Sequence, residues 1–191
     1  MHFPRRCNPI TIIFSGLIAA MAFSKCAVAQ PRPFVPANFA VPATLETPHF
    51  RARMLTVNDV VKDYDAVMTS IDHLQGSFGP GSTWPTRDLT FEQDLIDLGW
   101  HQKEFQTRRS FTYTVVSLDE SQVLGCLYMY PTTKGDYDAE IIMWVRASEV
   151  ARGLDAILFT AVKQWIKKDW PFKKAAYPGR EIKWHDWEAM K

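Results

Sequence analysis

The strongest pattern in the sequence is a helical repeat of apolar residues between positions 154 and 166. Lysines occupy other parts of the helix circumference, and Pro171 follows the repeat. Apolar side chains recur at steps of three and four, at Leu154, Ile157, Leu158, Ala161, Val162, Trp165 and Ile166. This period predicts a helix with one buried face, ended by the proline. We expect that face to pack on a sheet.

Four strands are predicted around this helix. Residues 111–116 and 123–130 have strand composition and are joined by a turn at Asp119–Ser121, so we expect an antiparallel hairpin. Ala139–Val145 is a third apolar run of strand length, and Lys174–Tyr177 predicts a short strand after the helix.

Two further helices are predicted upstream, after a strand at Phe50–Leu55. Each begins with a capping-box pattern, at Thr56 with Asp59 and at Thr90 with Gln93. The first would end near residue 74 and the second would run to residue 108. We expect their buried faces to comprise Val60, Val61, Tyr64, Val67, Met68 and Ile71 in the first helix, and Phe91, Leu95, Leu98 and Phe105 in the second. This order of elements indicates a mixed α/β sheet with helices on its faces.

The first 29 residues differ from the rest of the chain. Basic residues precede an apolar stretch from Ile10 to Phe23, and Ala27 and Ala29 follow at the spacing that signal peptidase requires. We therefore predict a signal peptide at 1–29 and an exported protein, periplasmic or secreted. The apolar stretch is shorter than the roughly 20 residues of a membrane span, so we expect no integral membrane segment in the mature chain.

A later start codon is the alternative to the leader. Translation from Met21 or Met54 would place the protein in the cytoplasm, although a start at Met54 would cut the first predicted strand. Between the leader and the folded domain at 50–191, we predict an extended segment at 30–49, because its five prolines disfavour both helix and central strand. Its order would depend on the packing of Phe34 and Phe39.

Composition narrows the function classes. The chain has 22 Lys and Arg against 21 Asp and Glu, so its net charge gives no general attraction to nucleic acid. His73 and His101 lack metal-ligand spacing with other His, Cys or acidic residues, and we predict no metal site. Cys126 stands alone in an apolar segment, where a cysteine is usually a small core residue. Nothing in the composition indicates the oligomeric state.

The element order and several stretches resemble the GNAT superfamily of acetyl-CoA-dependent N-acetyltransferases, as a divergent bacterial member. These stretches are Phe50–Arg53, Leu124–Tyr128, Glu140–Arg146 and Tyr177–Arg180, and the resemblance extends over roughly Phe50 to Pro178. It implies a mostly antiparallel central sheet with helices on both faces. The chain ends without room for the usual last two strands of the family, so we expect a shortened C-terminus.

The resemblance also implies a cofactor site. In this family two neighbouring strands diverge, pantetheine pairs with exposed backbone, and the pyrophosphate lies on amides at the N-terminus of the next helix. By position, the residues facing pantetheine would be Met143, Trp144 and Val145, and those facing the pyrophosphate would be Arg152, Gly153 and Leu154. Of the family's loop pattern only Gly153 is present, and Asp155 places a carboxylate where the pyrophosphate would approach.

Two residues are candidate catalytic groups by the same resemblance. Glu140 would be a general base that takes a proton from the acceptor amine, directly or through water, and Tyr177 a general acid. The alternatives are a solvated acid at Glu140, beside Asp136 and Asp138, and a packed ring at Tyr177.

The implied function is acetyl transfer from acetyl-CoA to an amine, in a small molecule or a peptide. A direct ternary complex is expected, because no nucleophile is evident in the sequence. The alternative is a non-catalytic exported binding or scaffold protein that keeps the GNAT fold. The degenerate loop, the shortened C-terminus and the leader favour that alternative.

Overall fold

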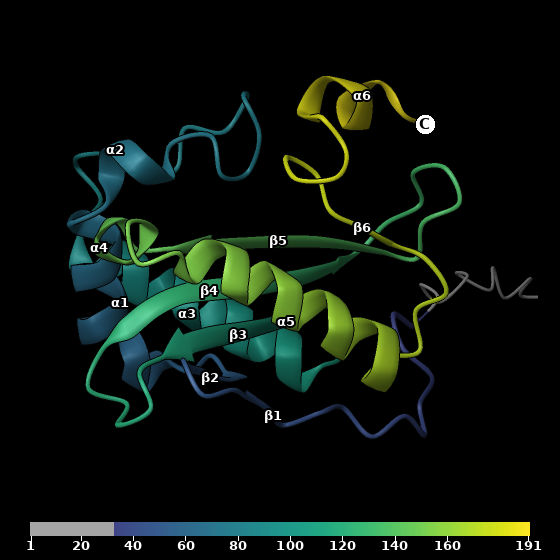
Figure 1. Ribbon diagram of the computed structural model, residues 1–191, viewed down its shortest axis with the longest axis horizontal. Coiled ribbons are helices and arrows are strands. Elements are labelled where there is room, and N and C mark those ends of the chain that lie inside the picture. The colour runs from purple at the N-terminus through teal and green to yellow at the C-terminus, as the bar shows by residue number, and fades with distance from the viewer. Residues whose placement is uncertain (1–32) are drawn as a thin grey trace, which may run out of the picture. The chain divides into compact units, whose positions relative to one another are not determined.

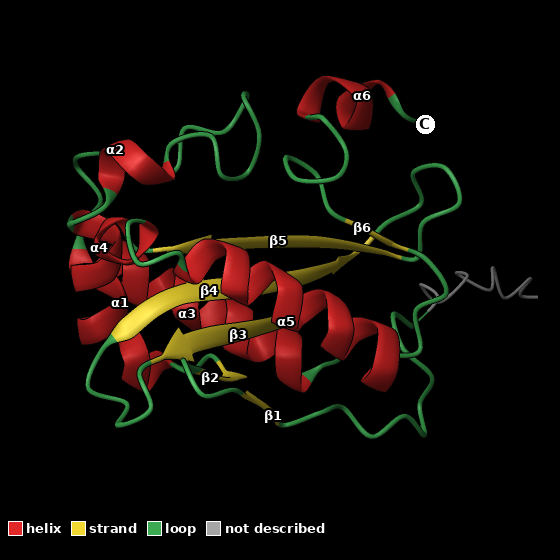
Figure 2. Ribbon diagram, in the orientation of Figure 1, coloured by secondary structure: helices red, strands yellow, loops and turns green. Residues whose placement is uncertain are grey.

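The computed structural model describes residues 33–191, so the predicted signal peptide at 1–29 lies outside the described residues. The central element is a six-stranded sheet whose strands lie side by side in chain order (Figures 1 and 2). Its strands are β1 (Thr44–Glu46), β2 (Arg51–Met54), β3 (Phe111–Val116), β4 (Val123–Pro131), β5 (Ala139–Val145) and β6 (Ala175–Ala176).

The sheet is antiparallel from β1 to β5, and only β5 and β6 run parallel. This arrangement confirms the predicted mostly antiparallel sheet and the hairpin of β3 and β4. Gly125 in β4 lies against the neighbouring strand so closely that a Cβ there would be 2.0 Å from the carbonyl oxygen of Trp144. Only glycine allows β4 and β5 to approach in this way.

Two rings of the proline-rich segment pack on the domain. The ring of Phe34 stacks on Phe111 at 5.6 Å, and the ring of Phe39 lies 5.7 Å from that of Trp170. Within this segment the structure adds a short edge strand, β1, which the prolines had argued against. It fits because it occupies a stretch without proline and pairs with β2 on one side only.

Helices cover both faces of the sheet (Figure 2). They are η1 (Val57–Asp59), α1 (Val60–Met68), α2 (Ile71–Leu74), α3 (Phe91–Gln106), α4 (Ala147–Val150), α5 (Leu154–Asp169) and α6 (Trp184–Ala189). Helix α5 lies in front of the sheet in Figure 1, and α1 and α3 lie behind it. Each face has its own apolar cluster, so the sheet is buried on both sides.

Helix α5 confirms the buried face that the apolar repeat at 154–166 predicts. Leu158 and Val162 are fully buried, and the Trp165 ring packs edge-on against Tyr113 with ring centroids 5.1 Å apart. Both predicted capping boxes are also present, at Thr56 with Asp59 and at Thr90 with Gln93. These features are local, which is why the sequence alone indicates them.

The predicted inner faces of α1 and α3 were partly wrong. Val61 is 68% exposed, whereas Asp63, two positions later, is 4% exposed. In α3, Phe91 and Leu95 are exposed and Asp94 is buried beside Leu98. Each helix is therefore rotated so that an aspartate faces the core.

The first of these helices is also interrupted. The single predicted helix ends at Met68, and α2 begins only at Ile71. Between them the Ser70 hydroxyl accepts a hydrogen bond from the Ala147 amide, which connects the break to the first residue of α4. The predicted strand at 174–177 is likewise shorter, since only Ala175 and Ala176 pair with β5.

The buried acid of α1 is compatible with the core because it can be neutral. The Cys126 thiol of β4 donates to Asp63 Oδ1 at 3.6 Å. Burial, followed by repulsion from Asp94, raises the Asp63 pKa to about 8. At neutral pH the folded state therefore holds a proton on Asp63.

Among residues 33–191, no helix combines the length and the apolar content needed to cross a membrane.

The raised pKa of Asp63 predicts how stability depends on pH. The folded state binds this proton more tightly than the unfolded state, whose pKa is 3.8, so the unfolding free energy falls as pH rises from about 4 to about 8. The slope from this one group is at most about 1.4 kcal/mol per pH unit. Asp63→Asn should remove that loss, so the variant gains stability relative to the parent as pH rises.

Urea unfolding of both proteins from pH 5 to pH 9 checks this prediction. Asp169→Asn is the control, because this exposed aspartate ends α5 far along the chain from Asp63. A difference between Asp63→Asn and the parent that stays constant across this range would contradict the prediction.

Candidate functional site

Strands β5 and β6 pair only at their first residues and then separate. The pairs are Ala139 with Ala175 and Glu140 with Ala176, and beyond them the chain leaves the sheet through a turn at Pro178–Gly179. The rest of β5 therefore has no strand on that side. This divergence is the one that the family resemblance implied.

Residues Met143 and Val145 face the open edge of β5. The amide of Arg146 donates to Leu124 of β4, and because hydrogen bonds alternate along an antiparallel pair, even-numbered residues of β5 face β4. The backbone carbonyls of these two residues accept hydrogen bonds from side chains. Arg180 Nη2 donates to Met143 O at 3.2 Å, and His73 Nε2 donates to Val145 O at 3.1 Å.

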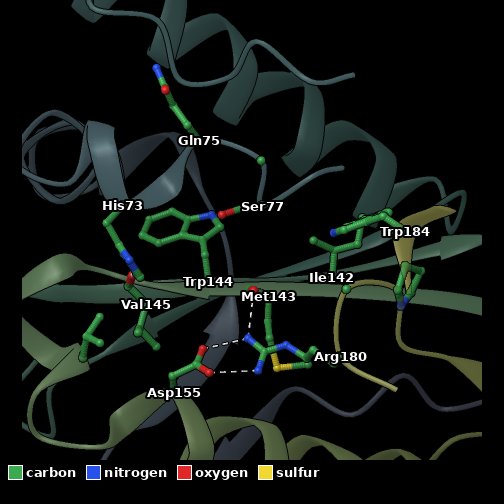
Figure 3. Close-up of a pocket in the computed structure, with 14 residues that line it drawn as sticks. His73, Gln75, Ser77, Ile142, Met143, Trp144, Val145, Asp155, Arg180 and Trp184 are labelled. Atoms are coloured by element: carbon green, nitrogen blue, oxygen red, sulfur yellow. Dashed lines mark hydrogen bonds and ion pairs between the residues drawn. The ribbon is translucent and has the colours of Figure 1, made fainter. Parts of the chain in front are cut away.

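A cleft of about 370 Å³ lies along this edge (Figure 3). Strand β5 forms its floor, α2 and the following glycine turn form one wall, and the start of α5 and the 178–180 turn form the other. Its principal lining residues are His73, Ser77, Ile142, Met143, Trp144, Val145, Asp155, Arg180 and Trp184. In Figure 3, Trp144 and Ile142 point to one side of β5, and Arg180 lies on the other side with Asp155.

Arg180 bridges the gap between β5 and α5. Its Nη1 and Nη2 donate to the two carboxylate oxygens of Asp155 at 2.9 and 2.7 Å, in addition to the bond with Met143 O. A two-pronged pair of this kind fixes the guanidinium plane. The carboxylate that would repel an approaching anion is therefore paired with a cation.

The N-terminus of α5 is open beside this pair. Gly153 has φ +74°, and a Cβ there would have no atom within 4 Å, so the backbone is approachable from outside. The amides of Arg152 and Gly153 donate to the preceding turn, whereas those of Leu154, Asp155 and Ala156 have no acceptor among residues 33–191. Free amides and the helix dipole make this end attractive to an anion.

The predicted cofactor residues thus lie in two groups around one edge. Met143, Trp144 and Val145 line the cleft. Arg152, Gly153 and Leu154 form the turn that begins α5, next to cleft residue Asp155. The Arg152 side chain is 76% exposed and lies 3.5 Å from Glu149. The sequence analysis considered His73 only as a metal ligand and gave Arg180 no role, although Arg180 belongs to a stretch that carried the family resemblance.

Glu140 lies two residues before Ile142 on the same face of β5. Its Oε1 accepts a hydrogen bond from Trp187 Nε1 of α6 at 3.0 Å, and burial raises its pKa above the usual value. It is half-buried and does not line the cleft as described above. It is therefore neither freely solvated nor in contact with the open edge at Met143.

Tyr177 lies on the opposite face. It belongs to the apolar cluster under α5, and its ring packs edge-on against Phe159 with centroids 5.5 Å apart. Burial raises its pKa to about 12. The structure therefore does not bring Tyr177 and Glu140 together, and the packed-ring alternative describes the position of Tyr177.

An aromatic wall closes the other side of the cleft. The Trp144 indole donates to the Tyr128 hydroxyl at 3.2 Å and lies 5.9 Å, centroid to centroid, from the Trp84 ring. At the opposite end, Trp184 lies against Gly179, where a Cβ would be 2.5 Å from the indole nitrogen. Gly179 also has φ +74°, so this turn requires glycine for both reasons.

Comparison with known proteins gives structural matches only. No family model matches the chain, and no curated protein does. A Bordetella pertussis protein assigned to the GNAT acetyltransferase family has a TM-score of 0.51 and 15% identity, over 66% of this chain and 74% of that one. The chain has the GNAT fold.

Two more solved structures agree. The ribosomal-protein-S5-alanine acetyltransferase of Vibrio fischeri has a TM-score of 0.53 and 16% identity, over 66% of this chain and 68% of that one. RimL, a ribosomal L7/L12 α-N-protein acetyltransferase solved in complex with coenzyme A, has a TM-score of 0.53 and 16% identity, over 66% of this chain and 70% of that one. At such identities the GNAT fold is shared, and function has to be argued from the site.

The described part of the chain holds no candidate metal centre. No group of three or more His, Cys, Asp or Glu side chains in residues 33–191 is arranged to hold an ion.

Proposed function

We propose that this protein is an N-acetyltransferase that moves an acetyl group from acetyl-CoA to an amine acceptor in a direct ternary complex. The observation that carries the proposal is the early separation of β5 and β6, which leaves Met143 and Val145 at an open edge beside the N-terminus of α5. The GNAT fold and the coenzyme A complex of RimL support it.

The open edge suits the pantetheine part of coenzyme A. Pantetheine carries amide groups in a linear chain, and an exposed strand edge binds such groups as it would bind another strand. In the free protein, the carbonyls of Met143 and Val145 accept hydrogen bonds from the side chains of Arg180 and His73, respectively. Both are side chains that a ligand can displace, whereas a paired strand would have closed the edge.

The start of α5 suits a diphosphate. The amides of Leu154, Asp155 and Ala156 point out of the helix end, and Gly153 leaves the approach open. Asp155 opposes an anion there, but Arg180 compensates its charge. We infer that coenzyme A binds with its diphosphate near these amides, at a cost in affinity that Asp155 imposes.

The acceptor would approach from the Trp144 side of β5. Bound acetyl-CoA supplies an activated thioester carbonyl, and the protein must position an uncharged amine against it. Glu140 lies on the same face as Ile142 and Trp144, and its raised pKa suits a group that accepts a proton near neutral pH. We propose Glu140 as the general base, acting through water because it lies outside the cleft lining.

Coenzyme A binding tests the site without knowledge of the acceptor. Gly153→Asp and Gly153→Asn form a matched pair, because both side chains tolerate positive φ and only the aspartate adds charge. We expect calorimetry to show roughly tenfold weaker binding for Gly153→Asp than for Gly153→Asn. Asp155→Asn should bind more tightly than the parent.

Gly81 provides the control for added charge, since it is exposed and has open space around its Cα. Gly81→Asp should leave coenzyme A affinity unchanged. Absence of any heat with millimolar coenzyme A and the parent protein would contradict the proposed function. Equal affinities for Gly153→Asp and Gly153→Asn would contradict the placement of the diphosphate.

Glu140→Gln tests the proposed base. We expect kcat to fall on the order of 10²-fold in an acetyl-CoA turnover assay with a panel of primary amines and peptides, while coenzyme A affinity is kept. The parent rate should rise as pH passes through the raised pKa of Glu140, and this limb should vanish in the variant. Glu188→Gln, an exposed acid on α6, is the control. An unchanged pH profile for Glu140→Gln would rule out the role.

A further inference from the structure

A second pocket lies outside the cleft, between α3 and the loop before it. Its volume is about 440 Å³, similar to small-ligand sites in other proteins. Trp84 and Leu89 of the loop and Ile96 and Trp100 of α3 supply apolar surface. Ile96 is 71% exposed and Trp100 is 56% exposed, which is unusual for side chains of this size.

The polar end of this pocket is a buried carboxylate without a partner. Asp94 is 4% exposed, and its Oδ2 is completely buried. That oxygen has no hydrogen-bond partner within residues 33–191. Burial without a donor is costly for a carboxylate, so a partner that supplied charge and N–H groups would be favoured there.

The pocket is negative and has no cation of its own. Besides Asp94, its lining includes Asp97, and no Lys, Arg or His lines it. Arg87 pairs with Asp72, and Lys103, which is not a lining residue, lies 5.3 Å from the centroid of the Trp100 ring. Asp97 is 57% exposed and lies 3.8 Å from His101 Nε2.

We propose that this pocket is a binding site for an organic ammonium ion, with its N–H groups on Asp94 and its apolar body between Trp84 and Trp100. Indole rings attract cations through their π faces, and a pocket that combines indoles with carboxylates favours an ammonium group over a neutral molecule of the same shape. A primary ammonium fits better than a quaternary one, because only the former donates hydrogen bonds to the buried carboxylate.

The pocket is separate from the cleft, and the proposal does not depend on the proposed function. It shares no lining residue with the cleft. The two adjoin through Trp84, whose ring lies 5.9 Å from that of Trp144 in the cleft wall. An ammonium ion bound beside Trp84 would therefore contact a residue that packs against the cleft.

Three probes of similar shape test the proposal on the full chain without coenzyme A. They are phenethylammonium, its N-trimethyl derivative and phenethyl alcohol, which differ in charge and in N–H donors. We expect the primary ammonium to bind most tightly and the alcohol most weakly by calorimetry. The indole N–H signals of Trp84 and Trp100 should shift in NMR spectra, whereas that of Trp165, a buried residue of α5, should not.

Variants locate the interaction. Asp94→Asn keeps the side-chain shape and should reduce phenethylammonium affinity at least roughly tenfold, because it removes the charge. Asp97→Asn should reduce it less, because Asp97 is largely exposed. Asp169→Asn, at the end of α5, is the control and should have no effect. Equal binding of ammonium and alcohol, or unchanged affinity in Asp94→Asn, would overturn the proposal, as would shifts centred on Trp144 and absent from Trp84 and Trp100.

Discussion

The geometry of the whole site depends on how briefly β5 and β6 pair. Two residue pairs hold the strands together, and the turn at Pro178–Gly179 then carries the chain away from the sheet. Every later feature follows from this separation. It leaves outward backbone groups on β5, makes room for the cleft, and places Arg180 where it can reach α5. The close approach at Gly125 keeps β5 attached to β4 on its other side.

Charge decides what this opening can accept. A helix N-terminus with free amides attracts anions, while Asp155 in its first turn repels them. The balance is set by Arg180, which arrives from a turn 25 residues further along the chain and pairs with both carboxylate oxygens. On the opposite face, Asp63 of α1 and Asp94 of α3 are buried without a cation beside them. Protonation offsets the desolvation penalty of the Asp63 carboxylate, and we propose that a ligand offsets that of Asp94.

Features fixed by neighbouring residues could be predicted from the sequence, and features that depend on distant partners could not. The face of α5, both capping boxes and the hairpin follow from local spacing, and the structure has them. The inner faces of α1 and α3 could not be predicted, because Asp63 is buried only where Cys126 meets it. The bond of His73 to Val145 likewise depends on tertiary placement, and a lone histidine in a helix gives no signal of it.

Residue-level amide hydrogen exchange of the free protein tests the open edge most directly. Ile142 and Trp144 donate toward β4, whereas Met143 and Val145 face the gap. We predict an alternation along β5, with the amides of Met143 and Val145 exchanging roughly tenfold or more faster than those of their neighbours. Equal protection of all four amides would contradict an open edge, and with it the account of how this fold could hold a cofactor.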